Sequence, residues 1–253
     1  MKKAHLGLLL LFFFSRGAFS SQALAGLYNQ ANQYYQKGNF ERAKELYQEI
    51  ISSGIINSDL YYNLANTYYQ LGELGEAMLW WWRAEKLAPR DPDLKYNLNL
   101  VQTQLEQKLN LGRSSSGFFL AFKKICHLAN SREWGIIFSA CLWLFWLGLA
   151  LRILWFNFRA KRFLNLLLIG IFLGGMFSGL GFGFRLRWEK APYAVVMNSE
   201  VKLRSGPGES FSQLTLLPEG FRVLIQECRA GYCRVKLSAG IVGWVKGKDL
   251  ERI

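Results

Sequence analysis

The sequence predicts a multidomain membrane protein that contains an all-α helical repeat, a two-helix transmembrane hairpin and a small all-β domain. Three observations lead to this prediction. Residues 24–57 recur as residues 58–91 at a fixed offset, two long uncharged apolar runs begin at Trp134 and Phe163, and short alternating runs fill residues 192–253. A chain of 253 residues has room for one large domain or two small ones.

The net charge of +13 lies mostly outside the predicted soluble domains. Residues 26–110 hold 8 basic and 10 acidic side chains, and residues 192–253 hold 9 basic and 6 acidic. The remaining 14 basic and 2 acidic side chains lie at the N-terminus and beside the apolar runs. Because a nucleic-acid-binding protein concentrates positive charge on a folded domain, this distribution favours a membrane protein and no nucleic-acid partner.

An export signal is predicted at residues 1–25. Residues 1–3 are basic at Lys2 and Lys3, residues 6–14 are apolar, and residues 23–25 have the small-x-small form of a cleavage site. The alternative is an uncleaved anchor, but Arg16 ends the apolar run well short of the ~20 residues that a span requires. The domain that follows is therefore expected outside the cytoplasm.

The first soluble region repeats itself at an offset of 34 residues. The identical pairs are Tyr28/Tyr62, Asn29/Asn63, Ala31/Ala65, Asn32/Asn66, Tyr34/Tyr68, Tyr35/Tyr69, Gln36/Gln70, Gly38/Gly72 and Ala43/Ala77. A fixed 34-residue period is typical of the helix pairs of the tetratricopeptide repeat (TPR) family, which these two repeats resemble.

The ends of the repeats also follow that pattern. Gly38 and Gly72 are expected to end the first helix of each pair in a left-handed cap. Residues 92–110 repeat the Tyr–Asn pair once more but contain no second helix, which predicts a capping helix. The TPR domain is therefore expected over residues 26–110.

Three consecutive tryptophans, Trp80–Trp82, stand in the second helix of repeat two. Trp81 matches Tyr47 at the 34-residue offset and is expected in the core. Adjacent helical residues point in different directions, so the other two need other neighbours. We expect at least one of them to be packed, Trp82 under the capping helix or Trp80 against a neighbouring helix; the alternative is an exposed aromatic contact for a partner or the membrane interface.

The inner face of the repeats is the predicted peptide-binding groove, because tyrosine and amide side chains offer flat apolar area with hydrogen-bonding ends. The candidate residues are Tyr28, Asn29, Asn32, Tyr35, Gln36, Tyr62, Asn63, Asn66, Tyr69 and Gln70. Basic residues that clamp a C-terminal carboxylate in some TPR proteins are missing from this set. The alternative is that these tyrosine, asparagine and glutamine side chains, here called the Tyr–Asn stripe, only face solvent and bind no ligand.

Residues 111–132 combine a Gly/Ser segment with a Phe-rich run, which predicts a linker that lies partly at the membrane interface. Transmembrane helices are predicted at 133–156 and 163–184, joined by a cytoplasmic loop at 157–162. Their uncharged stretches of 18 and 22 residues match the thickness of a bilayer core.

The second apolar run contains glycines at helical spacing, namely Gly170, Gly174, Gly175, Gly179 and Gly183. Such glycines either allow tight helix packing, within the hairpin or with a partner, or are simply common in transmembrane helices. Basic residues flank both runs, so they leave the orientation open. The export signal decides it, and both soluble domains are expected on the outer side of the bacterial inner membrane.

Residues 192–253 contain five short alternating runs separated by turn residues, which predicts an all-β domain. The order of "LRSGPG", "LLPEG", "GYCRVKL" and "GWVKGKDL" resembles the bacterial SH3 (SH3b) family. This resemblance implies a five-stranded SH3-like barrel with Trp244 packed inside. It also implies cell-wall peptides or protein segments as ligands.

Cys228 and Cys233 bracket a predicted hairpin turn. Opposing residues of an antiparallel pair can approach within bridging range, and a small exported domain gains from a covalent link, so a disulfide is predicted. The alternative is two half-buried thiols on opposite faces of the strands. Cys126 and Cys141 lie in or beside an apolar run and are expected to stay reduced.

We find no pattern that predicts catalysis, so the protein is not expected to be an enzyme. The chain has two histidines, His5 in the predicted signal and His127 beside the membrane; His127 follows Cys126, but no third or fourth metal ligand lies near them in the sequence. There is no phosphate-binding loop, and no metalloprotease or nucleophile-elbow pattern. No catalytic residue, cofactor or metal site is therefore predicted.

The order of signal, TPR pair, hairpin and SH3b domain, together with "DPDLKYNL" at residues 91–98, resembles the E-type proteins of the bacterial aerotolerance (Bat) operons. The resemblance implies a membrane scaffold of an envelope complex. The partners it implies include membrane proteins with von Willebrand A domains. The alternative is a peptidoglycan-binding or sensing module in which the TPR region is only a spacer.

Overall fold

The computed structural model describes residues 22–109, 125–126, 129–154 and 158–253. The chain divides into two compact units. One combines the N-terminal part, up to Leu111, with Pro192–Ile253, and the other is Gly112–Ala191. Most of the predicted signal at 1–25 and of the linker at 111–132 lies outside the described residues; residues 22–25 are helical.

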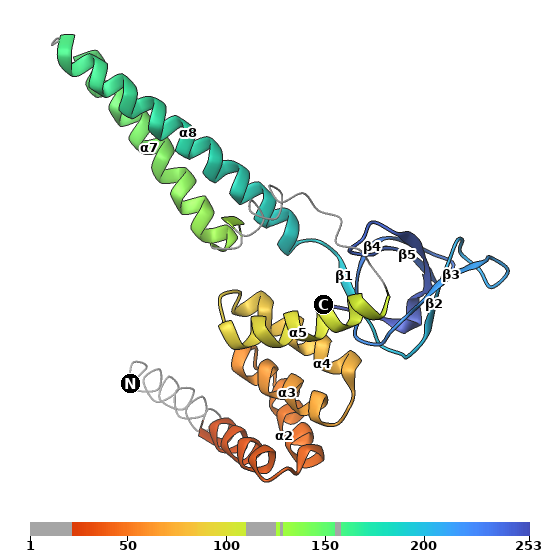
Figure 1. Cartoon of the computed structure of the whole chain (residues 1–253). Helices are drawn as coiled ribbons and strands as arrows, with labels where there is room; N and C mark the ends of the chain where they lie inside the picture. The colour runs from red at the N-terminus through yellow and green to blue at the C-terminus, as the bar shows by residue number, and fades with distance from the viewer. Residues whose placement is uncertain (1–21, 110–124, 127–128, 155–157) are drawn as a thin grey trace, which may run out of the picture. The chain divides into compact units, whose positions relative to one another are not determined.

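The N-terminal region is a helical repeat, as predicted. A helix over residues 22–36 is followed by α2 (Phe40–Ser52), α3 (Ser58–Gln70), α4 (Leu74–Leu87) and α5 (Pro92–Lys108). Successive helices lie side by side in chain order (Figure 1). The alanines shared by the repeats have no exposed surface, so the paired helices approach closely at Ala31, Ala43, Ala65 and Ala77.

Glycine ends the first helix of each pair. The φ angles of Gly38 and Gly72 are +77° and +81°, in the left-handed region that favours glycine. The Glu73 N–H donates to the carbonyl of Tyr68 at 3.0 Å and that of Gly72 to the carbonyl of Tyr69, so the last turn is closed by the paired bonds of a Schellman motif. The cap predicted from sequence is confirmed at both glycines.

The C-terminal region is one antiparallel sheet. Within the described residues it has seven strands, in the spatial order β3-β2-β6-β5-β4-β1-β7. They are β1 (Tyr193–Val196), β2 (Val201–Arg204), β3 (Gln213–Leu217), β4 (Arg222–Arg229), β5 (Tyr232–Lys236), β6 (Val242–Lys246) and β7 (Leu250–Arg252), with a short 3-10 helix, η1 (Gly247–Asp249), before β7.

The sheet is open, so the predicted closed barrel is wrong. β3 and β7 are its edges, and no strand pairing joins them. The five predicted runs correspond to β1, β2, β4, β5 and β6. The two edge strands were missed: β3 has only Leu217 buried, and β7 is three residues long, so neither shows a clear alternation.

Trp244 also departs from the prediction. In β6 the buried residues are Gly243 and Val245, and side chains alternate between the faces of a strand. Trp244 therefore lies on the face away from the core, where it is half-buried. Its register partners are Arg204 on β2 and Arg234 on β5.

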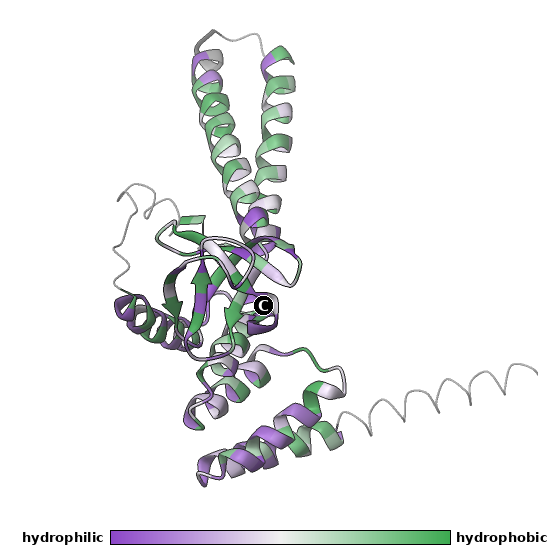
Figure 2. Ribbon diagram, turned by 90° about the vertical axis from the view of Figure 1, so that its right-hand side faces the viewer, coloured by the Kyte–Doolittle hydropathy of each residue, from purple (hydrophilic) through white to green (hydrophobic). Residues whose placement is uncertain are grey.

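The second unit contains two long apolar helices, α7 (Ser131–Leu154) and α8 (Phe158–Glu189). Stretches of 24 and 26 residues, Ser131–Leu154 and Arg162–Arg187, are long and apolar enough to cross a membrane. Both helices are hydrophobic over most of their length between hydrophilic ends (Figure 2). Residues 158–162 of the predicted loop belong to α8, which already begins at Phe158.

The glycines of α8 fall into two groups. A Cβ on Gly175 would lie 3.3 Å from Cys141, and one on Gly179 would lie 3.1 Å from the ring of Phe138, so these two allow α7 to approach α8. Gly170 and Gly174 meet no described atom within 4 Å of a Cβ position. Packing within the hairpin therefore explains only part of the glycine pattern.

Candidate functional site

The Tyr and Asn side chains shared by the repeats form hydrogen-bonded links between helices. The amide of Asn63 on α3 donates to the Tyr28 hydroxyl at 2.8 Å and to the Asn32 carbonyl oxygen at 3.2 Å. The Tyr47 hydroxyl of α2 donates to that same oxygen at 2.6 Å. One cluster thus joins both helices of repeat one to the first helix of repeat two.

The same cluster recurs 34 residues later. The amide of Asn97 on α5 donates to the Tyr62 hydroxyl at 3.2 Å and to the Asn66 carbonyl oxygen at 3.4 Å. The indole N–H of Trp81 on α4 donates to that oxygen at 2.9 Å. Trp81 replaces Tyr47 as the donor from the second helix, and the capping helix takes the place of a third repeat.

Burial keeps the tyrosine hydroxyls of the first cluster neutral. Desolvation raises the pKa of the Tyr28 hydroxyl and that of the Tyr47 hydroxyl, so both remain protonated at physiological pH. Asn32 and Asn66 accept bonds from two helices each. Five of the predicted groove residues therefore make hydrogen bonds that hold the helices together, namely Tyr28, Asn32, Tyr62, Asn63 and Asn66.

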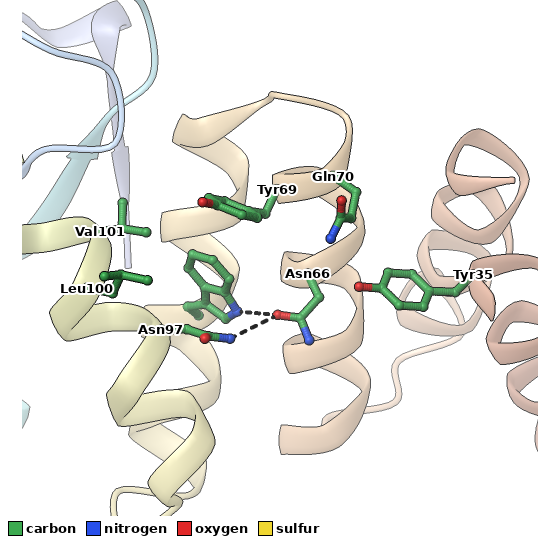
Figure 3. Close-up of a pocket in the computed structure, with 8 residues that line it drawn as sticks. Tyr35, Asn66, Tyr69, Gln70, Asn97, Leu100 and Val101 are labelled. Carbon is green, nitrogen blue, oxygen red and sulfur yellow. Dashed lines mark hydrogen bonds between the residues drawn. The ribbon is translucent and has the colours of Figure 1, made fainter. Parts of the chain in front are cut away.

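A pocket of about 220 Å³ opens on the face between the two repeats and the capping helix. It is lined by Tyr35, Asn66, Tyr69, Gln70, Trp81, Asn97, Leu100 and Val101. Figure 3 shows the bonds from Trp81 and Asn97 that hold Asn66 in its wall. The lining residues include no charged side chain, so the pocket suits an uncharged ligand group.

The structure brings together four of the ten predicted site residues in this pocket, namely Tyr35, Asn66, Tyr69 and Gln70. Asn29 and Gln36 are exposed and lie outside it. The sequence reasoning missed Trp81, Asn97, Leu100 and Val101. Asn97 could have been found, because it continues the Tyr–Asn repeat, whereas the two aliphatic residues look like any apolar positions of an amphipathic helix.

The three tryptophans point to three different neighbours. Trp80 packs edge-on against Tyr61 of α3, with ring centroids 5.0 Å apart, and Trp81 forms part of the pocket wall. The guanidinium of Arg222, on β4, lies 3.8 Å from the ring centre of Trp82. At least one of Trp80 and Trp82 was expected to be packed, and Trp80 does pack against a neighbouring helix; the contact that the structure shows for Trp82 is with the sheet.

Cys228 and Cys233 lie opposite each other on β4 and β5 and are joined in a disulfide, with their Cα atoms 4.0 Å apart. Ala230 and Gly231 form the turn between these strands with φ angles of +48° and +80°. Two consecutive residues with positive φ are typical of the tight hairpin turns that match strand twist. The short turn thus aligns the two cysteines.

Comparison with protein families agrees with both repeat and sheet. The family model of the tetratricopeptide repeat matches residues 24–53 and 58–90, and that of the bacterial SH3 domain matches residues 199–251. Comparison of the chain with curated proteins gives no match. The two domain types suggest protein–protein interaction or binding to the cell wall.

Proposed function

We propose that this protein is a membrane-anchored scaffold of a bacterial envelope complex that binds an extended peptide segment of a partner in its TPR pocket. The observation that carries the proposal is the uncharged aromatic and amide lining of that pocket. The TPR match supports the same class of function, since stacked repeats commonly present a concave binding surface.

The chemistry of the lining indicates the ligand. A volume of about 220 Å³ accommodates one large apolar side chain, which would contact Trp81 and Leu100. Tyr69 and Gln70 are exposed at the rim, where their polar ends can bond a peptide backbone. Binding should therefore depend on shape and hydrogen bonds, with little sensitivity to salt.

Placing a carboxylate in the pocket tests this proposal. Peptides selected from a random library on the detergent-solubilised chain should lose at least tenfold in affinity when Leu100→Glu is introduced, because the charge would be desolvated beside the ligand's apolar group. Affinity is measured by fluorescence anisotropy at 50 and 500 mM salt.

Asn99→Glu is the matched control. Asn99 neighbours Leu100 on α5, is exposed and does not line the pocket, so this variant should bind like the parent. Equal affinity of the parent and both variants would place the peptide elsewhere on the molecule. Selection of highly charged peptides with steep salt dependence would reject the uncharged ligand class.

The anchoring is supported by the hairpin. Large apolar side chains on α7, such as Trp143 and Trp146, are 78% and 62% exposed, a surface that lipid would cover. Contacts between α4 and the sheet place the TPR and SH3 regions in one unit, so both belong on one side of the membrane. The predicted signal makes this the outer side of the inner membrane.

The resemblance to the E-type aerotolerance proteins supports a narrower version of the proposal. It names membrane proteins with von Willebrand A domains as the partners whose segments would enter the pocket.

Peptidoglycan binding by the SH3 domain is a second candidate function, favoured by the surface around Trp244. This half-buried indole lies between Arg204 and Arg234 on the outer face of the sheet, an arrangement suited to sugar rings and carboxylates. Trp244→Ala should abolish retention of the full chain on purified cell-wall sacculi, measured by co-sedimentation. Retention that is unchanged, or that is lost equally in Leu100→Glu, would reject this site.

A further inference from the structure

Helix α4, the second helix of repeat two, does not cap its own N-terminus. Its N-cap residue, Glu73, makes no side-chain hydrogen bond to the helix, and its carboxylate instead pairs with Lys44 at 2.8 Å. Gly75 lies in the first turn of α4, where backbone N–H groups have no acceptor within the helix. Its N–H donates to a carboxylate oxygen of Glu219 at 2.7 Å. Glu219 stands in the turn between β3 and β4, so the SH3 region supplies the cap that α4 lacks.

Repeat one behaves differently. Asn39, at the position equivalent to Glu73, accepts a hydrogen bond from the backbone N–H of Arg42 and caps α2 from within the repeat. The two repeats are alike in their Tyr–Asn clusters but differ here. Of these two helices, α4 takes its cap from the sheet and α2 does not.

Two glycines allow the backbones to meet. A Cβ on Gly75 would lie 3.1 Å from the carbonyl oxygen of Met197 and 3.2 Å from Glu219. A Cβ on Gly220, whose φ is +81°, would lie 3.0 Å from Met78 and 3.1 Å from Leu74. Glycine inside the first turn of a helix and glycine in the facing turn are both explained by this close approach.

Arg222 joins the middle of α4 to the sheet. Its guanidinium lies 3.8 Å from the ring centre of Trp82 and 4.6 Å from that of Tyr193, so it is held between an α4 ring and a β1 ring. Burial is the main cause that lowers the pKa of Arg222. Among the described residues, the indole N–H of Trp82 is buried without a hydrogen-bond partner, so Trp82 contributes here through its ring.

The last turns of α4 are held as well. Arg83 donates to the carboxylate of Glu251 at 3.2 Å and to the carbonyl of Arg252 at 3.0 Å. Lys86 donates to the carbonyl of Ile253 at 2.9 Å. The SH3 region therefore contacts α4 at its N-terminus, its middle and its C-terminal half.

We infer that the SH3 domain is a clamp on α4 and thereby regulates the peptide pocket. Trp82 faces the clamp, while the adjacent Trp81 forms the pocket wall and holds Asn66 and, through it, Asn97 of α5. When the SH3 domain moves away from α4, the helix loses the Glu219 cap and the Arg222 contact with Trp82. The wall of the pocket that α4 and α5 form then becomes more mobile. The regulatory part rests on the proposed peptide site; the coupling between clamp and wall does not.

Hydrogen–deuterium exchange of the full chain in detergent tests the coupling without a ligand. In the double variant Glu219→Ala, Arg222→Lys, which keeps the positive charge that attracts Glu106 of α5, amide exchange should become at least tenfold faster in α4 and also in α5. Arg222→Lys alone, which keeps the Glu219 cap but loses the flat stacking group, should show a smaller increase in the same peptides.

Two matched controls isolate the clamp. Asn39→Ala removes a cap from repeat one, and Arg229→Gln removes an exposed arginine from the same strand as Arg222; neither should change exchange in α5. Faster exchange confined to residues 192–253 and α4 would overturn the coupling, and unchanged exchange everywhere would overturn the clamp. If no peptide is selected on the parent chain the peptide site fails, while the exchange result still decides the clamp.

Discussion

Replacing Asn66 with alanine is expected to lower the free energy of unfolding by about 2–3 kcal/mol, a large effect for a polar side chain on a repeat surface. The carbonyl oxygen of Asn66 accepts bonds from Trp81 and Asn97. Its loss leaves the indole N–H of a tryptophan that is 2% exposed without an acceptor, and a buried unpaired donor costs about 1–3 kcal/mol in addition to the lost bonds.

Chemical denaturation of the full chain, followed by circular dichroism, measures this change. Asn29→Ala is the control, because Asn29 is equivalent to Asn63 by the repeat but is exposed at the free end of the array. Asn66→Asp keeps the accepting oxygen and should recover part of the stability. A stable Asn66→Ala protein that fails only in peptide binding would show that the cluster serves the ligand, as the sequence alone suggested.

Removal of the Cys228–Cys233 disulfide should lower the stability of the SH3 region by about 2 kcal/mol. The cysteines are five positions apart, so the link closes a short loop, and the entropic gain rises with loop length. The expected result for Cys228→Ser, Cys233→Ser is a lower melting temperature of the full chain. Reduction of the parent should give the same decrease.

Alkylation in denaturant counts the free thiols. The protein purified from the envelope should be modified at two of its four cysteines before reduction, Cys126 and Cys141, and at all four afterwards. A variant without residues 1–25, retained in the reducing cytoplasm, should be modified at all four from the start. Four modified cysteines in the protein purified from the envelope would refute the disulfide.

The Tyr–Asn stripe shows how a repeated sequence can suggest two roles. Polar residues that recur on the inner face of a TPR array indicate either a ligand surface or links between repeats. The structure has Asn63 and Asn97 each bonded back to the preceding repeat, so much of the stripe is structural. The residues that remain candidates for binding are those that line the pocket between the repeats and the capping helix.

Local patterns were enough to predict most elements. The 34-residue period predicted the helix pairs, and Gly38 and Gly72 marked their ends, because a left-handed cap depends on a few neighbouring residues. Alternating runs predicted the central strands in the same way. Edge strands β3 and β7 bury few side chains, so their sequences show no clear alternation of apolar and polar residues.

Sequence alone was enough to predict the repeat, the strands of the sheet core, the two long apolar helices and the aromatic and amide character of the groove, because each depends on periodicity or on composition within a short segment. Packing in three dimensions, in contrast, determines that the sheet stays open, that Trp244 faces outward, and that the ring of Trp82 contacts Arg222. It also determines that Glu219 caps a helix 144 residues away in the chain. Contacts between distant segments follow from how whole surfaces pack, and no local pattern carries that information.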